Sequence, residues 1–191
     1  MFGEESEREQ FFEAAKLQAI SEYEKDNKNV QALIRWGGAL LELAHFKQGD
    51  QSQETIEEAI SKLKKALELD PESSQAQWCL GNAYTSLGFL CPDKTIALGK
   101  FKDAAECFKD CVKRDPTNET YKKAIEMCEK APEFYDEIQA HIASDRAGGA
   151  SARGAESAGG NDIWWEVGGW VLLGAVVVGA LVLAKSSKAS A

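Results

Sequence analysis

The chain has 191 residues, of which 28% are charged and 44% are hydrophobic, and its net charge at pH 7 is −9. An acidic chain is repelled by phosphate groups, which argues against nucleic acid as a partner and favours cationic partners through long-range attraction. This length provides one domain of ordinary size with additional segments.

The charge is concentrated in the first three quarters of the chain. Residues 1–145 carry 28 acidic and 18 basic side chains, a net charge of −10, and residues 146–191 carry 3 acidic and 4 basic ones. The first residues, MFGEESEREQ, contain no apolar run, so no signal or transit peptide is expected there. The first domain is therefore expected to carry the acidic surface.

The cysteine and histidine content predicts neither a metal site nor a cofactor. Five cysteines occur without a C-x-x-C pair, and the two histidines, His45 and His141, do not stand at zinc-ligand spacing. Most of the cysteines alternate with apolar residues at helical spacing. We expect them to be small buried side chains of a protein in a reducing compartment.

One stretch of the chain occurs twice. Residues 32–46 (ALIRWGGALLELAHF) return as residues 76–90 (AQWCLGNAYTSLGFL), and a second apolar stretch follows each copy and ends in Asp70-Pro71 or Asp115-Pro116. Each unit predicts a pair of helices in which small residues allow close approach. The Asp-Pro pairs are expected to supply an N-cap and a first-turn proline to the next helix. The positions shared by the two copies are Ala32/Ala76, Gly37/Gly81, Ala39/Ala83 and Leu43/Leu87.

Further helices are expected at both ends of the duplicated region. Residues 4–26 have apolar side chains at helical spacing and predict an amphipathic helix that caps the first unit. Residues 118–130 predict an end helix, which Pro132 bends or restarts. Such terminal helices cover the open ends of a stack of repeats.

The order of these elements resembles the tetratricopeptide repeat, which implies an all-α fold of helical repeats over residues 1–145. The units here are about 44 residues long instead of the usual ~34. The additional residues lie between the two helices of each pair, at 47–57 and 91–102, where they either lengthen helices or loop out.

The C-terminal part predicts a membrane anchor. Residues 146–162 are rich in Gly, Ala and Ser and predict a flexible linker. Within residues 163–184, the charge-free stretch 167–184 would span about 27 Å as a helix, close to the ~30 Å hydrocarbon core. The short tail 185–191 contains two lysines, which the positive-inside rule would keep in the cytosol, but insertion of a tail anchor moves this short end across. The anchor residues are Trp164, Trp165 and Trp170 at the interface and the small residues Gly174 and Gly179.

The first helices of the two units are expected to line a concave, largely apolar groove. Such a groove beside an acidic surface suits a peptide helix that is apolar on one side and basic on the other. Alternatively, Ile34, Leu41 and Trp78 are core residues covered by the N-terminal helix. Lys and Asn are absent from positions 34 and 38, which argues against the carboxylate clamp of chaperone-binding repeats. The predicted groove residues are Ile34, Gly38, Leu41, Glu42, Trp78 and Asn82.

The segments 35–43 (RWGGALLEL), 78–86 (WCLGNAYTS) and 130–133 (KAPE), with the insertions and the C-terminal span, resemble the plant-type small presequence receptor of the outer mitochondrial membrane translocase. The resemblance implies a non-enzymatic receptor that binds amphipathic presequences of precursor proteins. It also implies contacts with other translocase subunits, including the import pore, to which precursors are passed. The expected location is the mitochondrial outer membrane, with one membrane pass and the N-terminal domain in the cytosol.

Two other interpretations remain open at the level of sequence. The chain is also similar in organisation to the mitochondrial fission adaptor, in which two such repeats precede a tail anchor and recruit a large folded partner to an organelle surface. An enzyme is disfavoured, because the sequence contains no nucleophile elbow, phosphate-binding loop or metal-ligand cluster.

Overall fold

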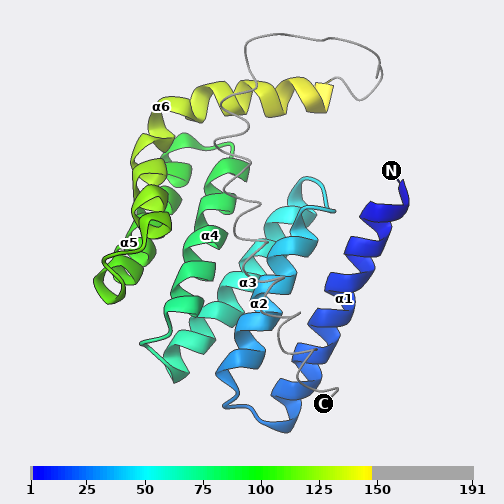
Figure 1. Ribbon diagram of the computed structural model, residues 1–191. Coiled ribbons are helices and arrows are strands. Elements are labelled where there is room, and N and C mark those ends of the chain that lie inside the picture. Colours follow the sequence, from blue (N-terminus) through cyan, green and yellow to red (C-terminus); the bar gives the residue numbers. More distant parts are fainter. Residues whose placement is uncertain (1, 148–191) are drawn as a thin grey trace.

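A computed structural model describes residues 2–147, which form helices and no strands. Successive helices run up and down beside one another (Figure 1). This arrangement confirms the all-α prediction for the described part of the chain. The anchor residues Trp164, Trp165, Trp170, Gly174 and Gly179 lie outside it. The helices are α1 (Phe2–Lys25), α2 (Val30–Ala44), α3 (Asp50–Leu69), α4 (Ser74–Leu90), α5 (Lys94–Arg114) and α6 (Glu119–Ala147).

The glycines shared by the two copies lie where two helices touch. A Cβ atom on Gly37 of α2 would lie 2.7 Å from Cγ of Leu63 in α3, and one on Gly81 of α4 would lie 2.5 Å from Cε1 of Phe108 in α5. Both distances are too short for any side chain larger than hydrogen. The prediction that small residues allow close approach within each pair is confirmed.

The additional residues of each unit mainly lengthen its second helix. Helix α3 begins at Asp50 and α5 at Lys94, so only residues 45–49 and 91–93 connect them to the preceding helices. The Ser52 hydroxyl donates a hydrogen bond to the Ala44 carbonyl at 2.9 Å. The Asp93 carboxylate accepts one from the Ile96 amide at 3.0 Å, which caps the start of α5.

The Asp-Pro pairs do not cap the following helices, contrary to the sequence prediction. Asp70 and Asp115 end α3 and α5, and their carboxylates accept hydrogen bonds from backbone amides two residues later, at 3.1 and 3.2 Å. The proline fixes the second residue of this turn, and the next helix starts only after it. The N-cap of α4 is therefore Ser73, whose hydroxyl accepts from the Ala76 amide at 3.3 Å.

The same turn occurs three times within residues 2–147. Asp26 begins a turn that ends at Asn29, the N-cap of α2, and Asp115 begins one that ends at Asn118, whose side chain accepts from the amides at the start of α6. The turns α1–α2, α3–α4 and α5–α6 are thus equivalent. Helix α1 therefore takes the place of the second helix of a pair before α2–α3. Helix α6 takes the place of the first helix of a pair after α4–α5.

Helix α6 covers both the main core and a smaller one. It is continuous through Pro132, bends, and crosses the upper end of the stack (Figure 1). The smaller core contains Ala97, Phe101, Ala131 and Tyr135. The Tyr135 hydroxyl donates to the Cys91 carbonyl at 2.6 Å, which fastens α6 to the α4–α5 turn. The helix extends to Ala147, the last residue that the structure describes.

Four of the five cysteines are buried, as predicted, and Cys91 is half-buried. Burial raises the pKa of Cys79 and Cys107 to about 12 and that of Cys111 and Cys128 to about 11. These groups are thiols at neutral pH and not nucleophiles. Within residues 2–147, no helix is apolar enough over a sufficient length to cross a membrane.

Candidate functional site

The predicted groove residues lie on α2 and α4, and most of them are buried. Ile34, Glu42 and Trp78 are 1%, 6% and 6% exposed, and Gly38 is buried as well. Leu41 and Asn82 are half-buried. Of the six residues, these last two present the largest share of their side chains at the surface.

Trp78 lies in the core between two other aromatic rings. Its indole is 5.0 Å from the ring of Phe108 in α5 and 5.1 Å from that of Tyr121 in α6, measured between ring centres. Helix α6 packs beside α4 because it takes the place of the first helix of a third pair. Trp78 is therefore a core residue, as the alternative interpretation expects, but the helix that covers it is α6 and not the N-terminal helix.

Glu42 is a carboxylate with little access to water. Its Oε2 lies 4.0 Å from Nη2 of Arg8 in α1, and this ion pair is the only one that the structure shows for it among the described residues. Burial raises the pKa of Glu42 to about 6, and the positive charge of Arg8 opposes this rise. The carboxyl group is therefore poised to change protonation just below neutral pH.

Helix α1 is fastened to α2 at several points along its length. Phe12 and Ala19 are buried against the stack, and Glu22 forms an ion pair with Arg35 of α2. The Arg8 guanidinium lies 5.9 Å from the centre of the Phe46 ring. These contacts confirm the prediction that an amphipathic N-terminal helix docks on the first unit.

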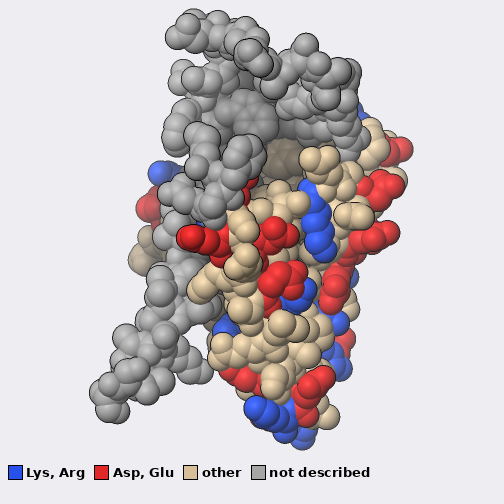
Figure 2. Space-filling view, turned by 90° about the vertical axis from the view of Figure 1, so that its right-hand side faces the viewer, with Lys and Arg blue, Asp and Glu red and all other residues tan. Residues whose placement is uncertain are grey.

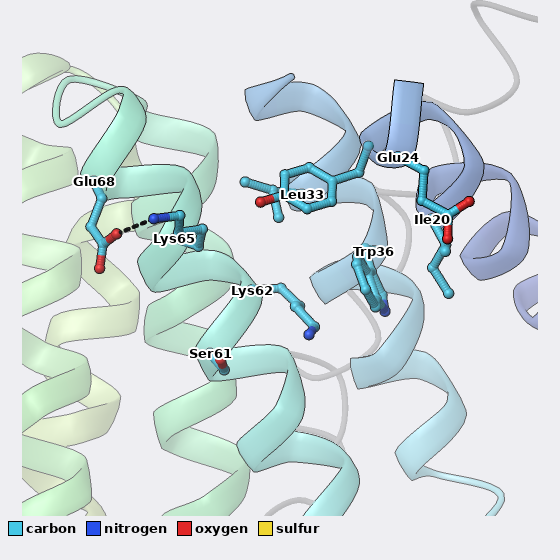
Figure 3. Close-up of a pocket in the computed structure, with 9 residues that line it drawn as sticks. Ile20, Glu24, Leu33, Trp36, Ser61, Lys62, Lys65 and Glu68 are labelled. Carbon is cyan, nitrogen blue, oxygen red and sulfur yellow. Dashed lines mark hydrogen bonds and ion pairs between the residues drawn. The ribbon is translucent and has the colours of Figure 1, made fainter. Parts of the chain in front are cut away.

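A pocket of about 490 Å³ opens between α1, α2 and α3 (Figure 3). Trp36 lies at its centre, with the Lys62 ammonium 4.1 Å from the centre of its ring and the Tyr23 ring 6.2 Å away. The Trp36 Nε1 atom is buried and has no hydrogen-bond partner among the described residues. The pocket is lined by Ile20, Tyr23, Glu24, Leu33, Trp36, Ser61, Lys62, Lys65 and Glu68.

The pocket combines an aromatic and aliphatic floor with a rim of both charges. Lys65 and Glu68 are paired on this rim at 2.8 Å. Such a surface can take an apolar side chain, or a cation over the indole face in place of Lys62. One weak signal for it is present in the sequence, since Trp36 takes the place that Leu80 has in the second copy. The pocket itself depends on how α1 packs.

No group of three or more His, Cys, Asp or Glu side chains in residues 2–147 is placed to hold a metal ion. What the described residues offer is a set of stacked helix pairs with a half-buried face on α2 and α4 and a pocket beside α1. These features define an all-α protein of stacked helix pairs whose surfaces suit binding.

The comparison with known proteins identifies the family. Residues 6–185 match the family described as plant-specific mitochondrial import receptor subunit TOM20, and the chain belongs to this family. Similar proteins include the mitochondrial import receptor subunits TOM20-3 and TOM20-4 of Arabidopsis thaliana. TOM20-3 is 34% identical over 190 residues, which cover 96% of this chain and 94% of the relative. TOM20-4 is 36% identical over 182 residues, which cover 95% and 94%.

Proposed function

We propose that this chain is a receptor subunit for mitochondrial protein import, which binds the amphipathic presequences of precursor proteins and passes them to the import pore. The observation that carries this proposal is the family match over residues 6–185. The acidic charge of residues 1–145 supports it, since presequences are basic. The role is that of a binding protein and not of an enzyme.

The proposal includes an arrangement at the membrane. Residues 163–184 would anchor the chain in the outer mitochondrial membrane with a single pass, residues 146–162 would form the linker, and residues 185–191 would cross. The α2–α3 and α4–α5 pairs would be tetratricopeptide-like repeats exposed to the cytosol. Other subunits of the translocase would then be reached by lateral contact in the membrane.

The proposed peptide-binding face is the one shared by α2 and α4. Leu41 and Asn82 would contact the peptide directly, above the layer formed by Ile34, Gly38, Glu42 and Trp78. Burial of two or three leucine-sized side chains of a peptide, less the cost of ordering it, gives roughly micromolar affinity. An apolar contact of this kind would weaken only modestly with salt.

The test uses the full chain in lipid nanodiscs, with empty nanodiscs as the blank. Two fluorescent peptides of equal length and charge are titrated: one is amphipathic as a helix, and the other is scrambled so that it has no apolar face. Leu41→Asp is compared with Ile96→Asp, which places the same charge on a side chain of α5 that is 54% exposed. We expect selective binding of the amphipathic peptide, weakened at least about tenfold by Leu41→Asp and unchanged by Ile96→Asp.

Three results would count against the proposal. Equal binding of both peptides that disappears with salt would reduce the interaction to charge alone. Binding of neither peptide would favour a membrane-anchored adaptor for a folded partner. Normal binding by a folded Leu41→Asp protein would move the binding face away from α2 and α4.

A further inference from the structure

The outer face of α1 is the exposed end of the stack formed by the described helices, and it differs from the rest of this charged helix. Helix α1 packs mainly on α2 through Phe12, Ala19 and their neighbours. On the opposite side, Phe11 is 43% and Leu17 is 62% exposed. An end helix of a repeat stack usually turns a polar, charged side to water.

The centre of this outer face carries no charge over three helical turns. Viewed down the helix axis, the exposed residues Gln10, Ala14 and Gln18 fall in the sector bounded by Phe11 and Leu17. The small Ala14 lies in the middle of this sector. Figure 2, which views the molecule from the side of α1, shows uncharged surface between acidic side chains. A small residue between two large apolar ones permits close approach of a second helix.

The two ends of this uncharged strip differ in charge. Glu5, Glu7 and Glu9 are exposed near the start of α1 together with Arg8, whereas the exposed charges at and just after its end, Glu24, Lys25, Asp26 and Lys28, balance one another. Basic side chains gather at the lower end of the view in Figure 2, where α1 turns into α2. Glu7 and Lys25 have no ion-pair partner within residues 2–147, and they lie 18 residues apart, which returns to the same side of the helix after about five turns.

We propose that the outer face of α1 is an interface between two copies of this chain, with the two α1 helices antiparallel. In that arrangement the two-fold axis passes close to position 16, midway between positions 7 and 25, so Ala14 lies about half a helical turn from it and Leu17 of each copy packs on the uncharged strip of the other. Glu7 of each copy then faces Lys25 of its partner, and the helix dipoles run in opposite directions. A parallel pair would place the acidic starts of both helices together. The inference does not rest on the proposed import function.

Disulfide formation in the full chain tests this arrangement. The Ala14→Cys variant is reconstituted in liposomes in a Cys91→Ser background, since Cys91 is the one cysteine in the chain that is not buried. Lys102→Cys, an exposed position on α5, is the matched control. On mild oxidation, Ala14→Cys should form a disulfide-linked dimer at least about five times as fast as Lys102→Cys, since Ala14 lies within the proposed interface, about half a turn from the two-fold axis, and Lys102 lies outside it.

A charge exchange tests the antiparallel orientation independently. Lys25→Glu should slow the Ala14→Cys cross-link several-fold, and Glu7→Lys together with Lys25→Glu should restore it, because the exchange re-forms both pairs. These positions are exposed, and circular dichroism checks that each variant is folded. Cross-linking at Ala14 no faster than at Lys102, no effect of Lys25→Glu, or no recovery in the double variant would each overturn the proposal.

Discussion

Close contact between helices at Gly81 makes a sharp prediction about stability. A Cβ atom at this position would lie 2.5, 2.8 and 2.9 Å from three carbons of the Phe108 ring. Phe108 is 2% exposed and packs on Trp78, so its ring has no free space into which to turn. The Gly81→Ala variant must therefore displace α5 or strain the ring.

The size of the effect follows from two opposing contributions. Overpacking a core of this kind costs about 1–3 kcal/mol, and replacing a helical glycine by alanine returns about 1 kcal/mol through helix propensity. The difference is about 0–2 kcal/mol, and we expect the upper half of this range, a net loss of about 1–2 kcal/mol in the free energy of unfolding, because the new Cβ atom would lie within 2.9 Å of three ring carbons. For a chain of this size, each kcal/mol lowers Tm by about 2–4 °C.

Gly99 of α5 provides the matched control, because a Cβ atom there has no neighbour within 4 Å. Gly99→Ala should raise the stability by about 0.5–1 kcal/mol through the same helix propensity. Both variants are compared with the unmodified chain by thermal unfolding followed by circular dichroism. A Gly81→Ala protein as stable as the unmodified chain, or a destabilised Gly99→Ala protein, would refute the packing argument.

Two further predictions concern Glu42 and the cysteines. The folded-state pKa of Glu42, about 6, is above its ordinary value of 4.5, so its ionisation destabilises the fold as pH rises through about 6. Glu42→Gln should therefore stabilise the chain by about 1–2 kcal/mol near pH 7 and have little effect below about pH 4; chemical denaturation at several pH values measures this, and a constant difference across this range would contradict it. In the native chain, iodoacetamide should alkylate Cys91 first, and mass spectrometry showing equal labelling of Cys79 or Cys111 would contradict their burial.

The helical framework could be predicted from the sequence because its signals are local. The repeated Gly and Ala positions, the spacing of the apolar residues and the prolines located the helices of each pair and both end helices. The Asp-Pro pairs alone predict the wrong N-caps, because Asp70 and Asp115 end the preceding helices and the residue that caps the next helix lies three residues later. The spacing Asp26…Asn29, Asp70…Ser73 and Asp115…Asn118 was available in the sequence and would have located all three turns.

The candidate site was harder to predict because burial depends on which helix packs on which. Trp78 has the register of a groove residue, and only the docking of α6 on α4 places Tyr121 over it. The pocket around Trp36 likewise exists only because α1 packs beside α2 and α3. Neither arrangement is encoded in the spacing of residues within a single helix.

Photo-cross-linking would show whether presequences bind the α2–α4 face. An amphipathic peptide with photoreactive leucines on its apolar side is bound to the full chain in nanodiscs and irradiated, and the attached residues are mapped by mass spectrometry. We expect cross-links concentrated on α2 and α4 around Leu41 and Asn82, and we expect unlabelled peptide to compete with them. Cross-links confined to other helices, or the same pattern with a scrambled peptide, would contradict binding at this face.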